Sequence, residues 1–464
     1  MYKFPSKQIS ASDFGMPLGL KLDPNNRWVK KAETIPWEEI EVRYAALFKN
    51  RKGNVAKPLR LALGALLIQT ERGISDAEVP LQIQETPCLQ YFCGLPAYKD
   101  ELPFDSSLMV YFRKRLTPEI LGEINELIIA KATQQADLPP NDDDDTDPPN
   151  DGTLIVDASC APQNIRYPQD TSLLNEAREN LEKMIDELHD PADGEKPRTY
   201  RKNAKRDYLN FAKKRNKTGK QIRKAVGKQL RYIKRDLQIV AEYLQSGKTL
   251  LNKRLVRLDT IENLYEQQLF MYENRTRKVD DRIVSLAQPW VRPIVRGKAK
   301  AKCEFGAKLE ISVVDGFTRL EHTSFDPYNE SQNLQEIIER YRARTGRYPR
   351  RVLVDKIYRN RDNIAFCKER KIQISGKPLG RPKKDAVIDK KQLRADETGR
   401  VEVERKFSHA KGSFGLGLVR ARLKETSETS IALSIVALNI AQVERILRAV
   451  LWWLGRRRKF VVVQ

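Results

Sequence analysis

Three carboxylates have the type and the placement to carry chemistry in this chain: Asp157, Asp355 and Glu404. Asp157 lies near the far end of the apolar run TLIVDAS, and Asp355 near the end of RRVLVDK. If these two runs form neighbouring strands, both carboxylates emerge at the same edge of a sheet. Two divalent cations about 3.5–4 Å apart need such oxygen ligands, with one cation activating water and the other stabilising the leaving oxygen.

The third carboxylate comes from the segment RVEVERKFSHAKGSFGLGLVRARLKE. On an α-helix Arg400, Glu404 and Lys411 lie within roughly 40° of one another, because each residue advances by about 100°. One helix face would then present an acid for metal and two cations for phosphate. Each aspartate alone is more often a cap or an ion-pair partner, and Glu404 alone could be an exposed helix acid. The prediction therefore depends on the combination.

Other chemistries are disfavoured by the cysteine and histidine content. The chain has 5 scattered cysteines, without a C-x-x-C pair, and 3 histidines. A zinc site and disulfides are therefore not expected, and no Ser or Cys nucleophile is paired with His409. Carboxylates must hold any metal, which indicates two Mg²⁺ ions, with Mn²⁺ as the alternative, and no small-molecule cofactor.

Periodicity predicts the elements that would position these carboxylates. Alternating apolar runs flank Asp315-Gly316, a two-residue hairpin signal. The expected order is a strand at 153–159, this hairpin within 306–326, a helix at 330–344, a strand at 350–356, a helix at 359–370 and a strand at 371–376. This order predicts an α/β fold, a ribonuclease H-like mixed sheet with a long helical insertion after its first strand, preceded by an all-helical N-terminal domain.

The predicted domains follow from shifts in composition along the chain. The acidic, proline-rich stretch PPNDDDDTDPPND cannot bury a core, so we expect a disordered linker there. The expected parts are a helical N-terminal domain with a basic edge at 1–138, the linker at 139–151, the first catalytic part at 152–167, a basic helical insertion at 168–303, the second catalytic part at 304–455 and a basic tail at 456–464.

A formal net charge of +23 and a pI near 9.7 favour a polyanionic partner, most often nucleic acid. An anionic membrane surface is the rival partner. No apolar run approaches the roughly 18 residues of a spanning helix, and the start MYKFPSKQIS lacks the apolar core of a signal peptide. The expectation is a cytoplasmic, nucleoid-associated protein without a membrane partner.

Between Tyr200 and Arg235 of the insertion, Lys and Arg are dense and few acids are available to pair with them. A solvated helix face is one interpretation, and contact with phosphate backbone is the preferred one. Apolar residues from Val226 to Leu244 recur at alternating steps of four and three, like a coiled-coil seam. This seam is a candidate contact for a homodimer.

The chain resembles DDE transposases of bacterial insertion sequences, of the insertion-sequence-five type. The resemblance lies in FDSSLMVYFRKRL, LIVDASCAPQNIRYPQDTSLLNEARE, LVDKIYRNRDN, SGKPLGRPKK and VERKFSHAKGSFGLGLVRARLKETSE. Arg400, Glu404 and Lys411 match the spacing of the family's signature, whereas Glu397 stands where the family has a tyrosine.

The resemblance implies an enzyme that binds terminal inverted repeats, cleaves with two metal ions held by the three carboxylates, and transfers the freed end to target DNA. It implies duplex DNA as partner and at least a dimer on it. A nuclease without strand transfer and an inactive DNA-binding derivative are the alternatives. The expected DNA contacts are Arg400, Lys411, Lys356, Arg359, Lys377, Arg381, Arg113, Arg115, Lys213, Lys214, Arg215, Arg223 and Lys224.

Overall fold

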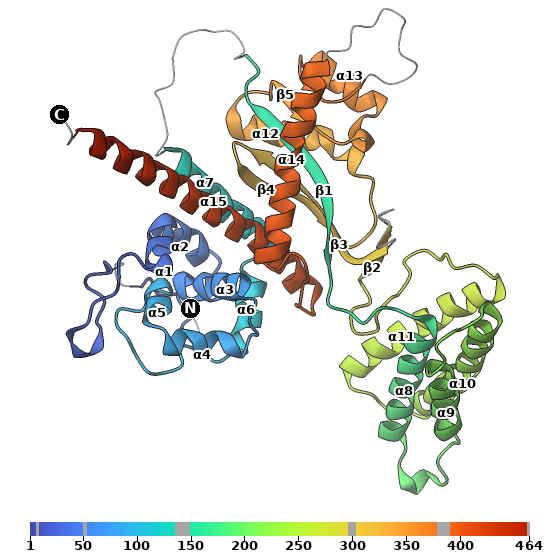
Figure 1. Cartoon of the computed structure of the whole chain (residues 1–464). Coiled ribbons are helices and arrows are strands. Elements are labelled where there is room, and N and C mark those ends of the chain that lie inside the picture. The colour runs from blue at the N-terminus through green and yellow to red at the C-terminus, as the bar shows by residue number, and fades with distance from the viewer. Residues whose placement is uncertain (6–8, 50–52, 135–148, 296–302, 378–389, 462–464) are drawn as a thin grey trace, which may run out of the picture. The chain divides into compact units, whose positions relative to one another are not determined.

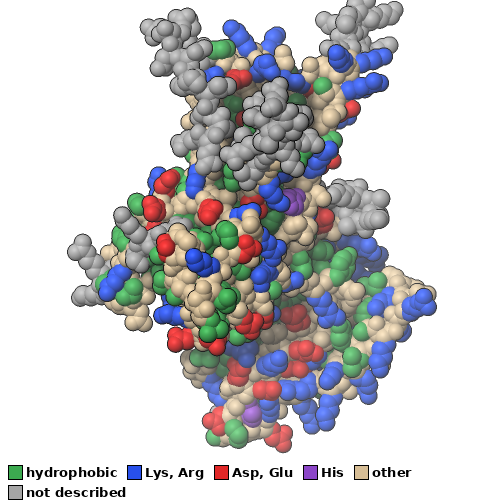
Figure 2. Space-filling view, turned by 60° about the vertical axis from the view of Figure 1, so that its left-hand side comes forward, with side chains coloured by type: hydrophobic (Ala, Val, Ile, Leu, Met, Phe, Trp, Pro, Cys, Tyr) green, Lys and Arg blue, Asp and Glu red, His purple; other side chains and the backbone are tan. Residues whose placement is uncertain are grey.

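The computed structural model describes residues 1–5, 9–49, 53–134, 149–295, 303–377 and 390–461 (Figure 1). The chain forms two compact units. The first comprises Met1–Pro162, Lys308–Ser324 and Tyr328–Gln464, and the second comprises Gln163–Ala307 with Phe325–Pro327. Lys and Arg side chains are spread over the surface seen in Figure 2, as the net charge of +23 requires. The predicted linker at 139–151 lies mostly outside the described residues.

The N-terminal part of the first unit is helical, as predicted. Helix α3 lies at its centre, since ten consecutive residues from Leu59 to Ile68 are buried. Trp28, Trp37 and Phe92 pack edge to face beside it. The helices of this part are η1 (Pro17–Gly19), α1 (Arg27–Thr34), α2 (Trp37–Ala45), α3 (Leu59–Arg72), α4 (Glu78–Glu85), α5 (Pro87–Phe92), α6 (Leu108–Arg115) and α7 (Pro118–Gln134).

The sheet has parallel and antiparallel pairs, which confirms the predicted mixed α/β architecture. Its path runs β2-β3-β1-β5-β6, and β4 pairs with β3. Strands β1 and β5 are parallel, as are β5 and β6, whereas β3 and β4 form an antiparallel hairpin. The strands are β1 (Thr153–Pro162), β2 (Arg292–Val295), β3 (Cys303–Val314), β4 (Phe317–Ser324), β5 (Arg351–Leu353) and β6 (Gln373–Ile374).

The predicted hairpin turn forms at Asp315-Gly316, where both residues have positive φ, 50° and 80°. Short helices η3 (Glu330–Gln332) and η4 (Lys356–Tyr358) lie beside α12 (Leu334–Thr345) and α13 (Arg361–Glu369). Side chains of α12 pack on β1 and β5 in an apolar core with Leu154, Val352 and Ile338 at its centre. Strand β2 was not predicted, because residues 168–302 were expected to be helical throughout.

Helix α15 (Lys424–Val461) is the core helix of the first unit. It packs against α3, α6, α7 and β4, so it joins the N-terminal helices to the sheet. Over Lys424–Val450 it is long and apolar enough to cross a membrane by length and composition, but 67% of its most apolar window is buried inside the protein. The expectation that no apolar run reaches spanning length is therefore wrong, and the burial marks this run as core.

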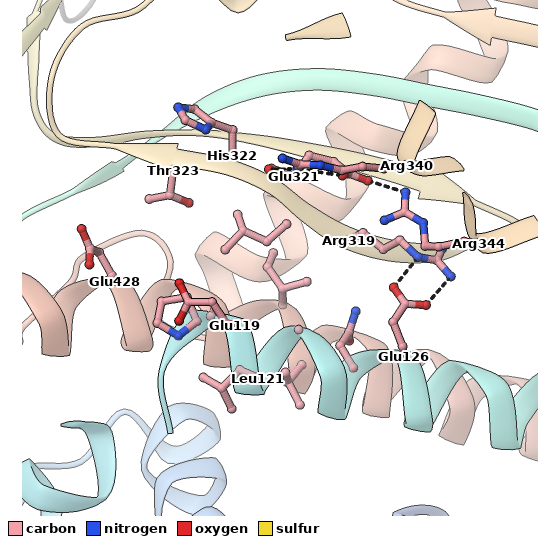
Figure 3. A pocket seen from close by; sticks show the side chains of 17 residues that line it. Glu119, Leu121, Glu126, Arg319, Glu321, His322, Thr323, Arg340, Arg344 and Glu428 are labelled. Atoms are coloured by element: carbon pink, nitrogen blue, oxygen red, sulfur yellow. Dashed lines mark hydrogen bonds and ion pairs between the residues drawn. The ribbon is translucent and has the colours of Figure 1, made fainter. Parts of the chain in front are cut away.

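A polar pocket of about 580 Å³ lies between α7, β4, α12 and α15 (Figure 3). Its arginines are neutralised by carboxylates around it. Arg319 donates to both carboxylate oxygens of Glu126 on α7, at 2.7 and 2.9 Å. Arg344 donates to Glu321 at 2.8 Å. The Arg319–Glu126 pair connects α7 to β4, and the Arg344–Glu321 pair connects α12 to β4. None of the three predicted catalytic carboxylates lines this pocket.

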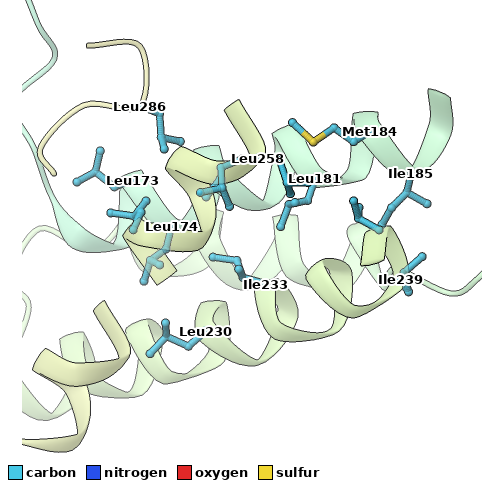
Figure 4. Close-up of a cluster of buried hydrophobic side chains, with 14 of the residues drawn as sticks. Leu173, Leu174, Leu181, Met184, Ile185, Leu230, Ile233, Ile239, Leu258 and Leu286 are labelled. Carbon is cyan, nitrogen blue, oxygen red and sulfur yellow. The ribbon is translucent and has the colours of Figure 1, made fainter. Parts of the chain in front are cut away.

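The second unit is largely a helical bundle built from α8 (Asp170–Leu188), α9 (Arg201–Ala212), α10 (Gly219–Gln245) and α11 (Asn252–Glu273), with η2 (Pro191–Asp193) between α8 and α9. Leu230 and Ile233 of α10 pack with Leu181 and Met184 of α8 in its core (Figure 4). The seam from Val226 to Leu244 therefore lies in the insertion's own core, and its interpretation as a dimer contact is wrong.

Candidate active site

The two predicted catalytic aspartates lie side by side at one end of the parallel pair β1 and β5. The strand register pairs Ile155 with Leu353. Asp157 and Asp355 each lie two residues further along the chain from this pair. Asp157 is half-buried within β1, whereas the side chain of Asp355 is 53% exposed after β5. Because the strands are parallel, the two aspartates occupy matching positions beyond the paired residues, as expected. Asp157 does not end its strand, however, since β1 continues to Pro162 and pairs there with β3 alone.

Helix α14 (Lys390–Ser413) brings the predicted cations to that edge. Arg400 Nη1 lies 3.6 Å from Asp355 Oδ1. Lys411 Nζ donates a hydrogen bond to Ser159 Oγ at 2.9 Å, two residues beyond Asp157. Both contacts are made by one face of the helix. Glu404 is exposed and lies on that face, roughly 40° from Arg400 and 20° from Lys411 around the axis.

Two features hold α14 close to the sheet. A Cβ atom added to Gly399 would lie 2.7 Å from Leu353 Cδ1, so the helix packs closely over β5 and a larger residue would displace the Leu353 side chain. On the opposite side of α14 the ammonium of Lys406 is buried and donates to Gly316 O in the hairpin turn and to Gln442 Oε1 on α15. These contacts fix the helix that carries Arg400 and Glu404.

Burial raises the pKa of Asp157 to about 6. The Ala158 amide, which donates to Asp157 Oδ1 at 2.9 Å, and the Arg400 guanidinium act in the opposite direction. The neighbouring carboxylates of Asp355 and Glu330 raise this pKa further. Carboxylates that repel one another in a half-buried place favour cation binding, because a cation relieves both the burial and the repulsion.

A polar cluster behind Asp157 was missed by the sequence analysis. Glu310 on β3 is fully buried and accepts a hydrogen bond from the Tyr358 hydroxyl at 2.9 Å, and burial raises its pKa. Glu330 on η3 forms an ion pair with Lys308 at 3.5 Å. Glu310 is an acid between the apolar residues Leu309 and Ile311 of the predicted hairpin, which was the one available signal. No sequence signal marked Glu330 as part of this cluster, since an acid at the start of a helix is common.

The donor set of this edge is all oxygen, which suits a hard divalent cation. In the described parts of the chain, however, no three His, Cys, Asp or Glu side chains converge closely enough to hold a metal ion. Asp157 and Asp355 are adjacent, and Arg400 instead pairs with Asp355. The carboxylates of Asp157, Asp355 and Glu404 are chemically suited to a divalent ion. Glu404 lies on the same face of α14 as Arg400, but it does not converge with the two aspartates.

Seven of the predicted DNA contacts outside α14 are exposed: Lys356, Lys377, Arg115, Lys213, Lys214, Arg215 and Lys224. Arg115 also places its guanidinium 5.1 Å from the ring centroid of Phe48. Arg381 lies outside the described residues. Because these side chains are exposed, phosphate groups can reach them, and their contact with DNA stays a prediction.

Three other predicted contacts are used by the fold itself. Arg113 is 7% exposed, and its guanidinium binds Asp76 and the Gln69 side chain. Arg359 donates to main-chain oxygens of the 374–377 segment. Arg223 donates to Tyr272 O and lies 4.1 Å from the Tyr272 ring centroid. Because these three guanidiniums already make contacts within the protein, the structure offers less support for them as DNA contacts than for the exposed cations, and their contact with DNA stays a prediction.

Comparison with known proteins defines the class. Residues 352–441 match the family model described as Transposase DDE domain, and residues 17–115 match that described as Transposase domain (DUF772). The chain is 27% identical over 179 residues to "Uncharacterized protein ORF8 in nfe locus" of Rhizobium meliloti, a match that covers 38% of this chain and 82% of that protein. No solved structure matches.

Both family models describe transposases, so the chain is an enzyme of DNA transposition. More particularly, it carries a DDE transposase domain together with an N-terminal transposase domain, and is a DDE-type DNA transposase. The DDE match contains Asp355, Arg400, Glu404 and Lys411, whereas Asp157 precedes it. Enzymes with this domain act on DNA and use divalent metal ions.

Proposed function

We propose that this transposase cleaves DNA at the terminal inverted repeats of an insertion sequence of the insertion-sequence-five type, and joins the freed 3′ end to target DNA. Asp157, Asp355 and Glu404 are the proposed catalytic and metal-binding residues. The observation that supports this most is that Asp157 within β1 and Asp355 just after β5 lie beside a helix face that bears Arg400 and Lys411.

When bound, two Mg²⁺ ions, or Mn²⁺ in their place, would activate water and stabilise the leaving oxygen of the phosphodiester. The chain's own residues prepare that site. Arg400 balances the charge of Asp355 and becomes available to a phosphate once a cation takes over this role. Lys411 is held at the same edge by Ser159, where it can meet the DNA backbone. Hydrolysis and transfer by this route need no covalent enzyme intermediate.

The proposal assigns the binding of transposon ends to the N-terminal helical part and to the exposed cations of the insertion. Pairing two ends requires two copies of the chain, so we propose a homodimer on duplex DNA, in the bacterial cytoplasm at the nucleoid. With the α10 seam buried in its own bundle, the contact between copies must be made by another surface.

Asp355→Asn provides the test, with Asp362→Asn as the control. Asp362 lies seven residues further along, exposed in the first turn of α13, so it matches the change in charge without touching the proposed site. Each purified protein is incubated with Mg²⁺, a plasmid and labelled duplexes taken from the termini of the element that encodes it. The wild type and Asp362→Asn should produce cleaved and joined DNA, and Asp355→Asn should produce neither while retaining DNA binding.

The possible results separate the alternatives. Cleaved ends without joined products from the wild type would identify a nuclease without strand transfer. Binding without cleavage by the wild type would identify an inactive derivative, consistent with Glu397 in place of the family's tyrosine. Undiminished cleavage by Asp355→Asn would overturn the assignment of the site.

A further inference from the structure

Helix α10 of the insertion carries a row of cations on its solvent face. Their positions lie within about 80° around the axis and span 14 residues, roughly 21 Å along the helix. The opposite face supplies Ile233 and Val240 to the core of the bundle. This row, called the α10 ridge below, consists of the exposed residues Lys220, Lys224, Arg231 and Lys234.

The ridge cations differ from the other cations of the same helix in having no partner within the protein. Lys228 pairs with Asp207 at 2.9 Å, and Arg235 lies 4.5 Å from the ring centroid of Tyr200. In the described part of the chain, none of the four ridge residues forms an ion pair. Four uncompensated charges on one face repel one another, and a polyanion relieves that repulsion.

The side chains in and around the ridge indicate which kind of polyanion it binds: duplex DNA, single-stranded nucleic acid or an anionic membrane. Three of the four ridge residues are lysines, whose compact ammonium charge suits phosphate, and phosphate contacts carry no direct information on base sequence. Stacking on single-stranded bases needs free aromatic faces, but Tyr200 is covered by Arg235 and the Tyr232 hydroxyl is bound to Asp207. An anionic membrane would need apolar side chains beside the cations, and exposed Ile222 lies roughly 160° from the middle of the ridge around the helix axis.

We propose that the α10 ridge binds the backbone of duplex DNA independently of base sequence, as a binding surface separate from the catalytic carboxylates. Lys213, Lys214 and Arg215, exposed in the turn before α10, extend it. Figure 2 shows Lys and Arg side chains crowded over the lower part of that view, where the insertion lies. This inference rests on the proposed transposase function. It adds that the α10 ridge contributes affinity for DNA in general, and does not recognise the base sequence of the transposon ends.

The test uses the full chain with all four ridge residues changed to glutamine. A control variant removes the same charge from the same unit by changing four cations that are already paired, Lys196, Arg201, Lys228 and Arg254. Fluorescence anisotropy without metal measures affinity for a terminal duplex and for a scrambled duplex between about 50 and 300 mM salt. Circular dichroism checks folding, and the double variant of Lys220 and Lys224 serves if the quadruple variant does not fold.

Each phosphate contact contributes about 0.9 to the slope of log affinity against log salt. The quadruple variant should therefore lower that slope by about 3 to 4, and the double variant by about 2, equally for both duplexes. The control should keep the wild-type slope. An unchanged slope, an equal loss in the control, or a loss confined to the terminal duplex would overturn the inference, as would a ridge-dependent preference for single strands. Binding is read without cleavage, so the outcome is independent of the Asp355→Asn test.

Discussion

Asp236 on α10 offers a sharp test of the energetics of the insertion. Its side chain has no exposed surface, and within the described residues neither carboxylate oxygen has a hydrogen-bond partner. Burial raises the pKa of Asp236 to about 7, and the nearby Glu182 carboxylate raises it further against the opposing effect of Arg178, Arg235 and Arg201. We therefore expect that Asp236→Asn, which imitates the protonated acid, stabilises the bundle.

The size of the effect follows from linkage. Below pH 3.8, the reference pKa of an aspartate, the carboxyl is protonated in both states and no penalty exists. As the pH rises towards 7, the unfolded chain releases the proton while the folded bundle retains it, so folding becomes progressively less favourable. At about 1.4 kcal/mol per pKa unit, the penalty reaches up to about 4 kcal/mol near pH 8 and is less than half of that near pH 5. Asp236→Asn removes this penalty.

Hydrogen exchange of peptides from α10 in the full chain measures the gain as slower local opening. Wild type and variant are compared at the same pH, near 5 and near 8, so that the intrinsic pH dependence of exchange cancels. The control is Asp259→Asn on the exposed side of α11, which should leave protection unchanged. Equal gains at both pH values, or faster exchange in Asp236→Asn, would refute the reasoning.

Two further predictions concern the candidate active site. Gly399→Ala should displace the Leu353 side chain beneath α14 and reduce DNA cleavage by up to about 10-fold without loss of DNA binding, whereas Gly412→Ala, which meets no atom within 4 Å, should be silent. Cleavage should also fall below about pH 6 because protonated Asp157 cannot hold a cation. Since Arg400 lowers the pKa of Asp157, Arg400→Gln should move this acid limb to higher pH in a pH–rate profile, and an unmoved limb would contradict the assignment.

The sequence by itself determined the order of the elements that position the candidate site. Short continuous apolar runs defined β1 and β5, and alternating runs around Asp315-Gly316 defined the hairpin, because strand and turn preferences act over a few neighbouring residues. The helical period placed Arg400 and Lys411 on one face, and both contact the sheet edge. These features depend on local patterns, which a single sequence contains.

Only the tertiary structure decided what the long cationic side chains and the helix faces contact. Arg113 and Lys114 are adjacent in a basic run, yet Arg113 is buried against Asp76 while Lys114 is exposed. The coiled-coil pattern of α10 was correct as a pattern, but its partner is α8 of the same chain. Partners far apart in sequence are chosen by packing of the whole domain, and a flexible cation reaches whichever carboxylate or carbonyl that packing brings near.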